Sequence, residues 1–283
     1  MNINEALMEA AKILKRSQIS YPKLESRLLL SYLLSKTQEY IILHTNSLLS
    51  QEHLEKFFKL IELRKKYVPI AYLIGYREFY GRNFLVNDSV LIPRSDSEIL
   101  IDAVVKDYNY CKTKVNILEL GVGSGCLIIT LLLELKNTIG LGIDIEVDAL
   151  QVAESNCQKY QLKKSLTLIQ SNWFSNLVPD QKYDIIIVNP PYISNCELDK
   201  VAQETLLYEP YSALFAENGG LKSYQDIARS ASAFLRCNGR LYLELGYSQA
   251  EEVGKIFKSS GFTLEQEYYD LAGYCRCFKF KII

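Results

Sequence analysis

The stretch that decides the fold is VNILELGVGSGCLII, which runs from Val115 to Ile129. It opens with an apolar run typical of a buried strand, continues with a glycine loop, and ends in the start of an apolar helix. Glycine permits backbone conformations, and close approach of a ligand, that a Cβ would prevent. The stretch therefore predicts a strand, a ligand-binding loop and a helix in immediate succession.

Outward from this stretch, helical and strand patterns alternate from Pro93 to the end of the chain. Strands are expected near residues 115–120, 139–144, 165–170, 183–189, 239–245, 262–268 and 273–281. Such alternation is typical of a parallel sheet with helices on both faces. No helix separates the last two strands, so we expect an α/β fold whose seven-stranded sheet is mostly parallel, with the last strand antiparallel.

Residues 1–74 have a helical pattern instead, and we expect a small helical bundle there. A first helix has an apolar stripe, a second begins at Pro22, and Ser50 is suited to cap a third. The second helix is expected to turn inward Leu24, Leu28, Leu29 and Leu33. Residues 75–92 then suggest a hairpin linker, which leaves 93–283 as the ligand-binding domain.

The glycine loop and the next strand end suit a particular nucleoside cofactor. The spacing is G-x-G-x-G rather than the dinucleotide pattern G-x-G-x-x-G, and Glu119 stands just before it. S-adenosylmethionine has no phosphate but carries an ammonium and a sulfonium, which an acidic residue suits. Asp144 can accept the ribose hydroxyls. The expected cofactor-binding residues here are Glu119, Gly121, Val122, Gly123, Ser124, Gly125 and Asp144.

A tetrapeptide at a later strand end indicates the chemistry. Asn189-Pro190-Pro191-Tyr192 follows the apolar run from Tyr183 to Val188. The Asn189 side-chain oxygen and the Pro190 carbonyl can each accept one N–H of a planar NH2 group, and proline makes the loop stiff. Tyr192 offers a flat face. We expect Asn189, Pro190 and Tyr192 to be catalytic, all four residues to bind substrate, and Asn189 also to border the cofactor.

Composition excludes several classes of protein. The chain has 283 residues, a net charge of −1 and two histidines, and a pI of about 6.2, so it lacks the basic surplus of a duplex-binding protein. Seven scattered cysteines without C-x-x-C predict reduced thiols and no metal site. With neither a signal-peptide pattern nor a long apolar run, we expect a cytoplasmic protein without a membrane segment.

Further motifs give the chain a resemblance to a known family. PIAYLIG (69–75), EFYG (78–81) and VLIPR (90–94) precede the glycine loop, and YEP (208–210), GGL (219–221), LELG (243–246) and DLAG (270–273) follow the tetrapeptide. Over nearly its whole length the chain resembles the HemK/PrmC-type release factor glutamine N5-methyltransferases.

The resemblance implies a Rossmann-like class I S-adenosylmethionine methyltransferase that modifies the glutamine of the Gly-Gly-Gln motif in peptide chain release factors. It also implies that the N-terminal domain docks this protein substrate. The family often has Asp before an aromatic residue at the third strand end, whereas this chain has Asn172-Trp173. Asn172 can still meet the adenine amino group through its oxygen, and both residues are expected at the cofactor.

Three other readings compete with this one. The same tetrapeptide would serve a nucleic-acid amine methyltransferase acting on adenine N6 or guanine N2. A non-catalytic binding module and a nicotinamide oxidoreductase are disfavoured by the intact motifs and by the glycine spacing. We expect a monomer whose partner is a protein, with no direct contact to nucleic acid.

Overall fold

The structure, a computed structural model, describes all residues from Met1 to Ile283. The chain forms two compact units. The first comprises Met1–Tyr76 together with Val201–Tyr208, and the second comprises Arg77–Lys200 together with Glu209–Ile283. None of the helices is long and apolar enough to cross a membrane.

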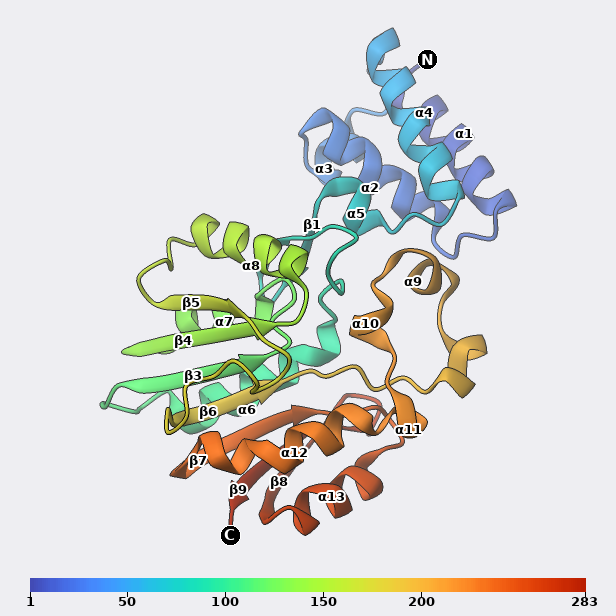
Figure 1. The fold of residues 1–283 in the computed structure, drawn as a ribbon. Coiled ribbons are helices and arrows are strands. Elements are labelled where there is room, and N and C mark those ends of the chain that lie inside the picture. Colours follow the sequence, from blue (N-terminus) through green and yellow to red (C-terminus); the bar gives the residue numbers. More distant parts are fainter. The chain divides into compact units, whose positions relative to one another are not determined.

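The first unit is helical, as the sequence pattern predicts (Figure 1). Its helices are α1 (Ile3–Arg16), α2 (Pro22–Leu34), α3 (Gln38–Leu43), α4 (Gln51–Lys65), α5 (Ile70–Ile74) and α9 (Gln203–Tyr208). The side chain of Ser50 accepts a hydrogen bond from the His53 amide and so caps α4, as predicted. Ile3, Leu14, Phe57 and Ile61 are fully or almost fully buried in its core.

The prediction of which face of α2 is buried is partly wrong. Leu24 is 43 % exposed, whereas Ser26, Leu29 and Leu30 are buried. Leu24 lies two residues before Ser26, which places it on the opposite side of a helix with 3.6 residues per turn. Ser26 tolerates burial because its hydroxyl donates to the Pro22 carbonyl at 2.7 Å.

The short helix α9 joins the first unit although it lies more than a hundred residues further along the chain. The guanidinium of Arg64, itself only 5 % exposed, pairs with Glu25 at 2.5 Å and with Glu204 of α9 at 2.6 Å. The Tyr208 hydroxyl also donates to the Lys66 carbonyl at 2.8 Å. These contacts hold α9 against the end of α4, an arrangement that no sequence pattern indicated.

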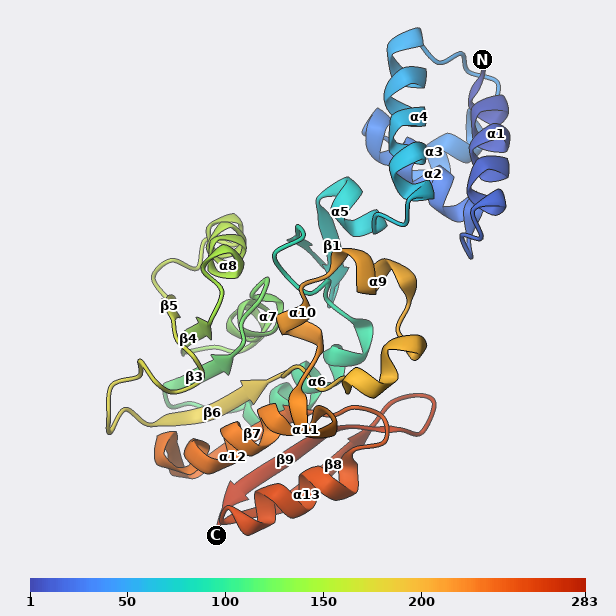
Figure 2. The same cartoon turned by 45° about the vertical axis from the view of Figure 1, so that its right-hand side comes forward.

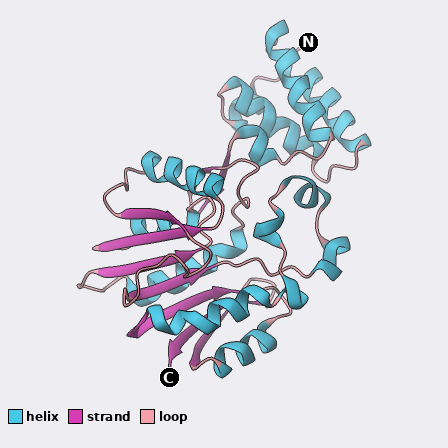
Figure 3. Ribbon diagram, viewed as in Figure 1, coloured by secondary structure: helices cyan, strands magenta, loops and turns pink.

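The second unit is built on a seven-stranded sheet (Figure 3). Its strands are β3 (Val115–Leu120), β4 (Thr138–Asp144), β5 (Leu166–Gln170), β6 (Tyr183–Val188), β7 (Leu235–Glu244), β8 (Phe262–Tyr269) and β9 (Cys275–Ile282). The order is β5-β4-β3-β6-β7-β9-β8. The first five strands pair in parallel, and β9 is antiparallel to both its neighbours. The predicted fold is confirmed.

Helices cover both faces of the sheet, as Figures 1 and 2 show. Helices α6 (Glu98–Tyr108), α7 (Cys126–Glu134) and α8 (Val147–Lys159) pack into one core, and α12 (Lys222–Phe234) and α13 (Ala250–Ser259) pack into the other. A hairpin of β1 (Tyr76–Phe79) and β2 (Arg82–Leu85) buries Phe79 and Phe84 in the first of these cores. The predicted hairpin is therefore present and anchored to the sheet domain.

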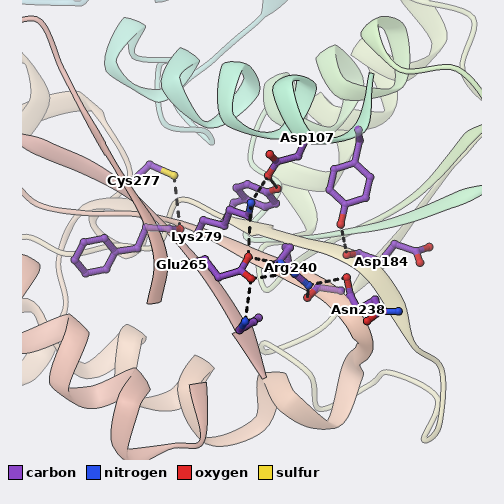
Figure 4. A network of polar contacts seen from close by, with 12 residues as sticks. Asp107, Asp184, Asn238, Arg240, Glu265, Cys277 and Lys279 are labelled. Carbon is purple, nitrogen blue, oxygen red and sulfur yellow. Dashed lines mark hydrogen bonds and ion pairs between the residues drawn. The ribbon is translucent and has the colours of Figure 1, made fainter. Parts of the chain in front are cut away.

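A polar network ties β7, β8 and β9 to α6 beside Arg240 and Tyr242 of β7 (Figure 4). Lys279 lies 2.7 Å from Asp107 and 3.6 Å from Glu265, and Glu265 also pairs with Arg240. The Tyr242 hydroxyl donates to Asp107. These pairings join α6 to three neighbouring strands of the sheet.

The carboxyl ends of β3 and β6 lie side by side in the middle of the sheet. The chain runs outward through β4 and β5 from β3, and then returns to place β6 on its other side. Ligands of open α/β sheets bind in the crevice at such a reversal of strand order. Short segments that follow β6 lie beyond this end: η2 (Asn195–Lys200), α10 (Tyr211–Leu214) and α11 (Glu217–Gly220).

Candidate active site

The glycine loop after β3 borders a cavity of about 430 Å³ at the carboxyl end of the sheet. Gly121 and Gly123 both adopt positive φ, +69° and +50°, and a Cβ on either would meet no protein atom within 4 Å. Their missing side chains leave room for a ligand against the backbone. Gly125 differs, because its Cβ would lie 2.9 Å from Ile129 Cδ1 of α7 and 3.5 Å from Ala153 Cβ of α8, so glycine leaves space for side chains there.

Asp144, at the end of β4, connects the glycine loop to the turn that follows β4. Its Oδ2 accepts from the Gly123 amide at 2.9 Å, and its Oδ1 accepts from the Glu146 amide at 3.0 Å. Burial raises the pKa of Asp144, while these amide hydrogen bonds oppose the rise. The carboxylate lines the cavity, and its two oxygens together have about four lone pairs, more than the backbone amides of Gly123, Glu146 and Ile145 occupy.

Glu119 lines the cavity just below the glycine loop and is 1 % exposed. Its Oε2 accepts from the Ile128 amide in the first turn of α7 at 3.0 Å. Burial raises the pKa of Glu119 well above its usual range, with Asp144 contributing repulsion. A cationic ligand beside these two carboxyl groups would offset that cost.

The remaining wall comes from the ends of β5 and β6 and from two other segments. The cofactor residues predicted after β5, Asn172 and Trp173, both line the cavity, as do Asn189 and Pro191 after β6. Trp173 has a φ of +47°, and its carbonyl accepts from the Ser171 hydroxyl at 2.7 Å. The further walls are residues 89–97 and 210–217.

Asn189 is the residue of the tetrapeptide whose orientation the structure defines. Its Nδ2 donates to the Ser97 hydroxyl at 3.1 Å. Since the amine end of the side chain is held in this way, the Oδ1 acceptor is left for a ligand in the cavity. Ser97 lines the same cavity. It was not among the residues expected at the site, since it is 92 residues away in sequence and nothing in the pattern pairs it with Asn189.

Pro190 and Tyr192 are not part of the cavity wall. Pro190 is buried. The Tyr192 hydroxyl lies 3.5 Å from Glu244 Oε1, and the Tyr192 carbonyl accepts from Gln249 Nε2 at 3.0 Å. The roles expected for the Pro190 carbonyl and the Tyr192 ring remain predictions. The structure shows in addition that Tyr192 is held by Glu244 of the LELG motif and by Gln249.

An ion pair at the cavity wall was missed by sequence reasoning: Arg94 lines the cavity, and Glu209 lies behind it. Arg94 Nη2 lies 2.5 Å from Glu209 Oε1, and Glu209 Oε2 accepts from the Ile92 amide at 3.0 Å. This buried carboxylate joins segment 92–94 to the start of segment 209–217. Both residues stand in motifs of the resemblance, VLIPR and YEP, which was the only signal that could have found them.

Comparisons with known proteins agree with this architecture. Residues 5–75 match the family described as PrmC N-terminal domain, and residues 95–223 match the methyltransferase small domain. A release factor glutamine methyltransferase of Buchnera aphidicola subsp. Schizaphis graminum is 36 % identical over 96 % of both chains. The chain belongs to the release factor glutamine methyltransferase family. The family resemblance drawn from the motifs is thereby confirmed.

Other relatives of this family member are longer. A bifunctional methyltransferase of Rickettsia felis is 42 % identical over the whole of this chain, yet the match covers 58 % of that relative. The chain thus spans little more than half the length of such relatives. Among solved structures, a methyltransferase of Pyrococcus furiosus aligns with a TM-score of 0.53 at 14 % identity, covering 72 % of this chain and 89 % of that one. It supports the fold alone.

The cavity residues fit S-adenosylmethionine, the methyl donor of this methyltransferase family. The lining includes four carboxyl side chains and a single guanidinium, that of Arg94, which is already paired with Glu209. A pyrophosphate would find little positive charge there, whereas an ammonium and a sulfonium would be stabilised. The open backbone at Gly121 and Gly123 supplies the space for such a ligand.

Proposed function

We propose that this protein transfers a methyl group from S-adenosylmethionine to the side-chain amide nitrogen (N5) of the glutamine in the Gly-Gly-Gln motif of peptide chain release factors. The observation that carries the proposal is Asn189, whose amide is held by Ser97 with Oδ1 left for a ligand. The Buchnera relative, which this chain matches over 96 % of its length, is a release factor glutamine methyltransferase, and this supports the choice of substrate.

The cofactor would lie across the ends of β3, β4 and β5. Glu119 and Asp144 would face its positive charge and its ribose, and Asn172 with Trp173 would border its adenine. When bound, S-adenosylmethionine supplies a methyl group that is activated by the adjacent positive sulfur.

The chain's own residues must then overcome the weak nucleophilicity of an amide, whose lone pair is delocalised into its carbonyl. Asn189 Oδ1 and the Pro190 carbonyl would each accept one of the two amide hydrogens, which orients the nitrogen and favours positive charge on it. Tyr192 would pack against the amide plane. The nitrogen held in this way would accept the methyl group, and one of its two amide protons would leave to water.

The partner and setting belong to the same proposal. We assign docking of the release factor to the N-terminal helical unit, which matches the PrmC N-terminal domain. A net charge of −1 supports a protein substrate rather than nucleic acid. We expect the enzyme to act as a monomer in the cytoplasm.

The test is transfer of labelled methyl to purified release factor, with the same factor carrying a changed Gly-Gly-Gln glutamine, bulk DNA and bulk RNA as parallel substrates. Label on the unmodified factor alone supports the proposal, whereas label on nucleic acid overturns it. Asn189→Ala should abolish transfer and change cofactor affinity by no more than a few fold. Retained transfer by this variant would contradict the role of Asn189.

A further inference from the structure

A buried asparagine with no assigned role lies on α8. Asn156 is 0 % exposed, and its helix neighbours Ala153 and Cys157 belong to the same hydrophobic core as Phe84 of the hairpin. Burying an amide side chain is costly unless its donors and its acceptor are satisfied. An asparagine in such a core therefore indicates a specific set of partners.

Asn156 uses both its donors and its acceptor on the backbone of two other segments. Its Oδ1 accepts from the Leu85 amide at 2.7 Å, and its Nδ2 donates to the Leu85 carbonyl at 3.0 Å. The same Nδ2 donates to the Ser124 carbonyl at 2.9 Å. Two carbonyls at one end and an amide at the other leave the side chain a single orientation. Since Leu85 ends β2 and Ser124 belongs to the glycine loop, one side chain joins the hairpin to the loop.

Ser124 lies between two glycines with positive φ, +50° at Gly123 and +78° at Gly125. Glycine loses more conformational freedom on folding than any other residue, so this stretch needs contacts that hold it. The Gly123 amide is held by Asp144 at 2.9 Å, and the Ser124 carbonyl is held by Asn156 at 2.9 Å. Because Ser124 lines the cavity, a change in the second of these bonds reaches the cavity wall directly.

We propose that Asn156 is a positioning residue for the methyl-donor site, and that it holds the glycine loop in its binding conformation through the Ser124 carbonyl. Asn156 does not line the cavity, so it acts on the cofactor only through the loop. Its other two bonds go to Leu85 of the hairpin, which Phe79 and Phe84 anchor in the core. The hairpin is thereby a support for the loop. The inference concerns the cofactor, and it holds whichever nitrogen receives the methyl group.

Aspartate has nearly the same shape as asparagine, so it isolates the effect of the two donors. In Asn156→Asp an acceptor for the Leu85 amide remains, whereas the second oxygen faces the Leu85 and Ser124 carbonyls and, when ionised, has no proton to donate. The Ser124 carbonyl is then repelled, and the loop spends less time in the conformation that receives the cofactor. The apparent affinity falls in proportion to the population of that conformation.

The experiment is a calorimetric titration of S-adenosylmethionine into the cofactor-free protein and its variants. We expect Asn156→Asp to weaken binding by about 10- to 100-fold, the range for a buried carbonyl that has lost its donor. Asn156→Ala removes the donors without adding a charge, so it should weaken binding in the same direction and serves if the aspartate variant does not fold. An affinity within twofold of the wild type in a folded variant of either kind would overturn the inference.

Tyr160→Phe is the matched control. The Tyr160 hydroxyl donates to the Asn83 carbonyl of the same hairpin at 2.7 Å, and its ring centroid lies 5.3 Å from that of Phe84. The substitution removes one hydrogen bond to the hairpin, keeps the ring and leaves the glycine loop untouched. Cofactor affinity should therefore stay within twofold of the wild type. If Tyr160→Phe weakens binding as much as Asn156→Asp, the effect comes from a loosened hairpin and the inference fails.

A split between kinetic constants adds a readout that a general loss of stability would not produce. In Asn156→Asp the KM for S-adenosylmethionine should rise about as much as the dissociation constant does. The KM for the release factor, and kcat at saturating cofactor, should change by less than about twofold, because the tetrapeptide is not affected. Equal rises in the two KM values would contradict a role confined to the cofactor loop.

Hydrogen exchange of the cofactor-free protein does not depend on methyl transfer. Peptides that cover residues 121–126 should exchange faster in Asn156→Asp but not in Tyr160→Phe, and peptides that cover β9 should exchange alike in all three proteins. Unchanged exchange of the loop in Asn156→Asp would also overturn the inference. If the wild type labels no release factor while loop exchange and cofactor affinity respond in this way, the proposed function fails and the positioning role stands.

Discussion

The contact between Gly220 and the Tyr192 carbonyl can be tested separately from backbone strain, because Gly219 beside it also has positive φ but lacks this contact. Gly219 and Gly220 have φ of +69° and +84°, so alanine at either position is strained. A left-handed alanine costs about 1–2 kcal/mol. A Cβ at Gly219 would meet nothing within 4 Å, whereas one at Gly220 would overlap the Tyr192 carbonyl oxygen and lie 2.8 Å from Gln249 Nε2.

The overlap adds overpacking, which typically costs about 1–3 kcal/mol. We therefore expect Gly219→Ala to lower the free energy of unfolding by about 1–2 kcal/mol, and Gly220→Ala by about 2–5 kcal/mol. Because the obstructed carbonyl belongs to Tyr192, Gly220→Ala should also slow methyl transfer, and Gly219→Ala should not. Gly219→Ala is thus the matched control for backbone strain.

The assay is urea unfolding followed by circular dichroism, with kcat measured on the same preparations. Equal losses of stability in the two variants, within about 0.5 kcal/mol, would refute the reasoning. Such a result would mean that the Tyr192 carbonyl yields freely. The loop would then not be held in place by Gly220 and Gln249, and kcat would be the same in both variants.

Three further outcomes are expected. Asp144→Ala should weaken S-adenosylmethionine binding by about 10- to 100-fold in calorimetry, as for a hydrogen bond to a charged group, and unchanged affinity would contradict its ribose role. Arg64→Ala should lower the unfolding free energy by about 3–5 kcal/mol because it leaves Glu25 buried and unpaired, while exposed Lys65→Ala should change it little. The pKa of Glu244 is about 7 in the folded state and exceeds its unfolded value, so the folded state binds the extra proton. The free energy of unfolding of the wild type should therefore fall as the pH rises from about 4.5 to about 7, by an amount on the order of 3 kcal/mol relative to Glu244→Gln. Parallel pH–stability curves for the two proteins would refute this.

The sheet could be predicted because its strands are nearly continuous apolar runs, such as Tyr183–Val188, that must be buried on both faces. The glycine loop and Asp144 could be found because each follows such a run at the carboxyl edge. Both signals are local in sequence, so the sequence of this one chain is sufficient to predict the sheet, the glycine loop and Asp144.

The inward face of α2 and the position of α9 could not be predicted in this way. Leu24 and Leu29 look alike as sequence, and what decides between them is which side of α2 meets α1 and α4. Helix α9 is held by Glu204 and Tyr208, whose partners Arg64 and Lys66 lie more than 130 residues earlier. Contacts of this length have no local pattern.

The same division holds at the site. The sequence by itself determined which functional groups the site contains: a glycine loop with acidic neighbours, and an asparagine between a buried strand and two prolines. Only the tertiary structure decided which way Asn189 points, because that depends on its hydrogen bond to Ser97. An amide side chain is nearly symmetric in shape, and only hydrogen-bond partners brought from other strands and helices can choose between its two ends.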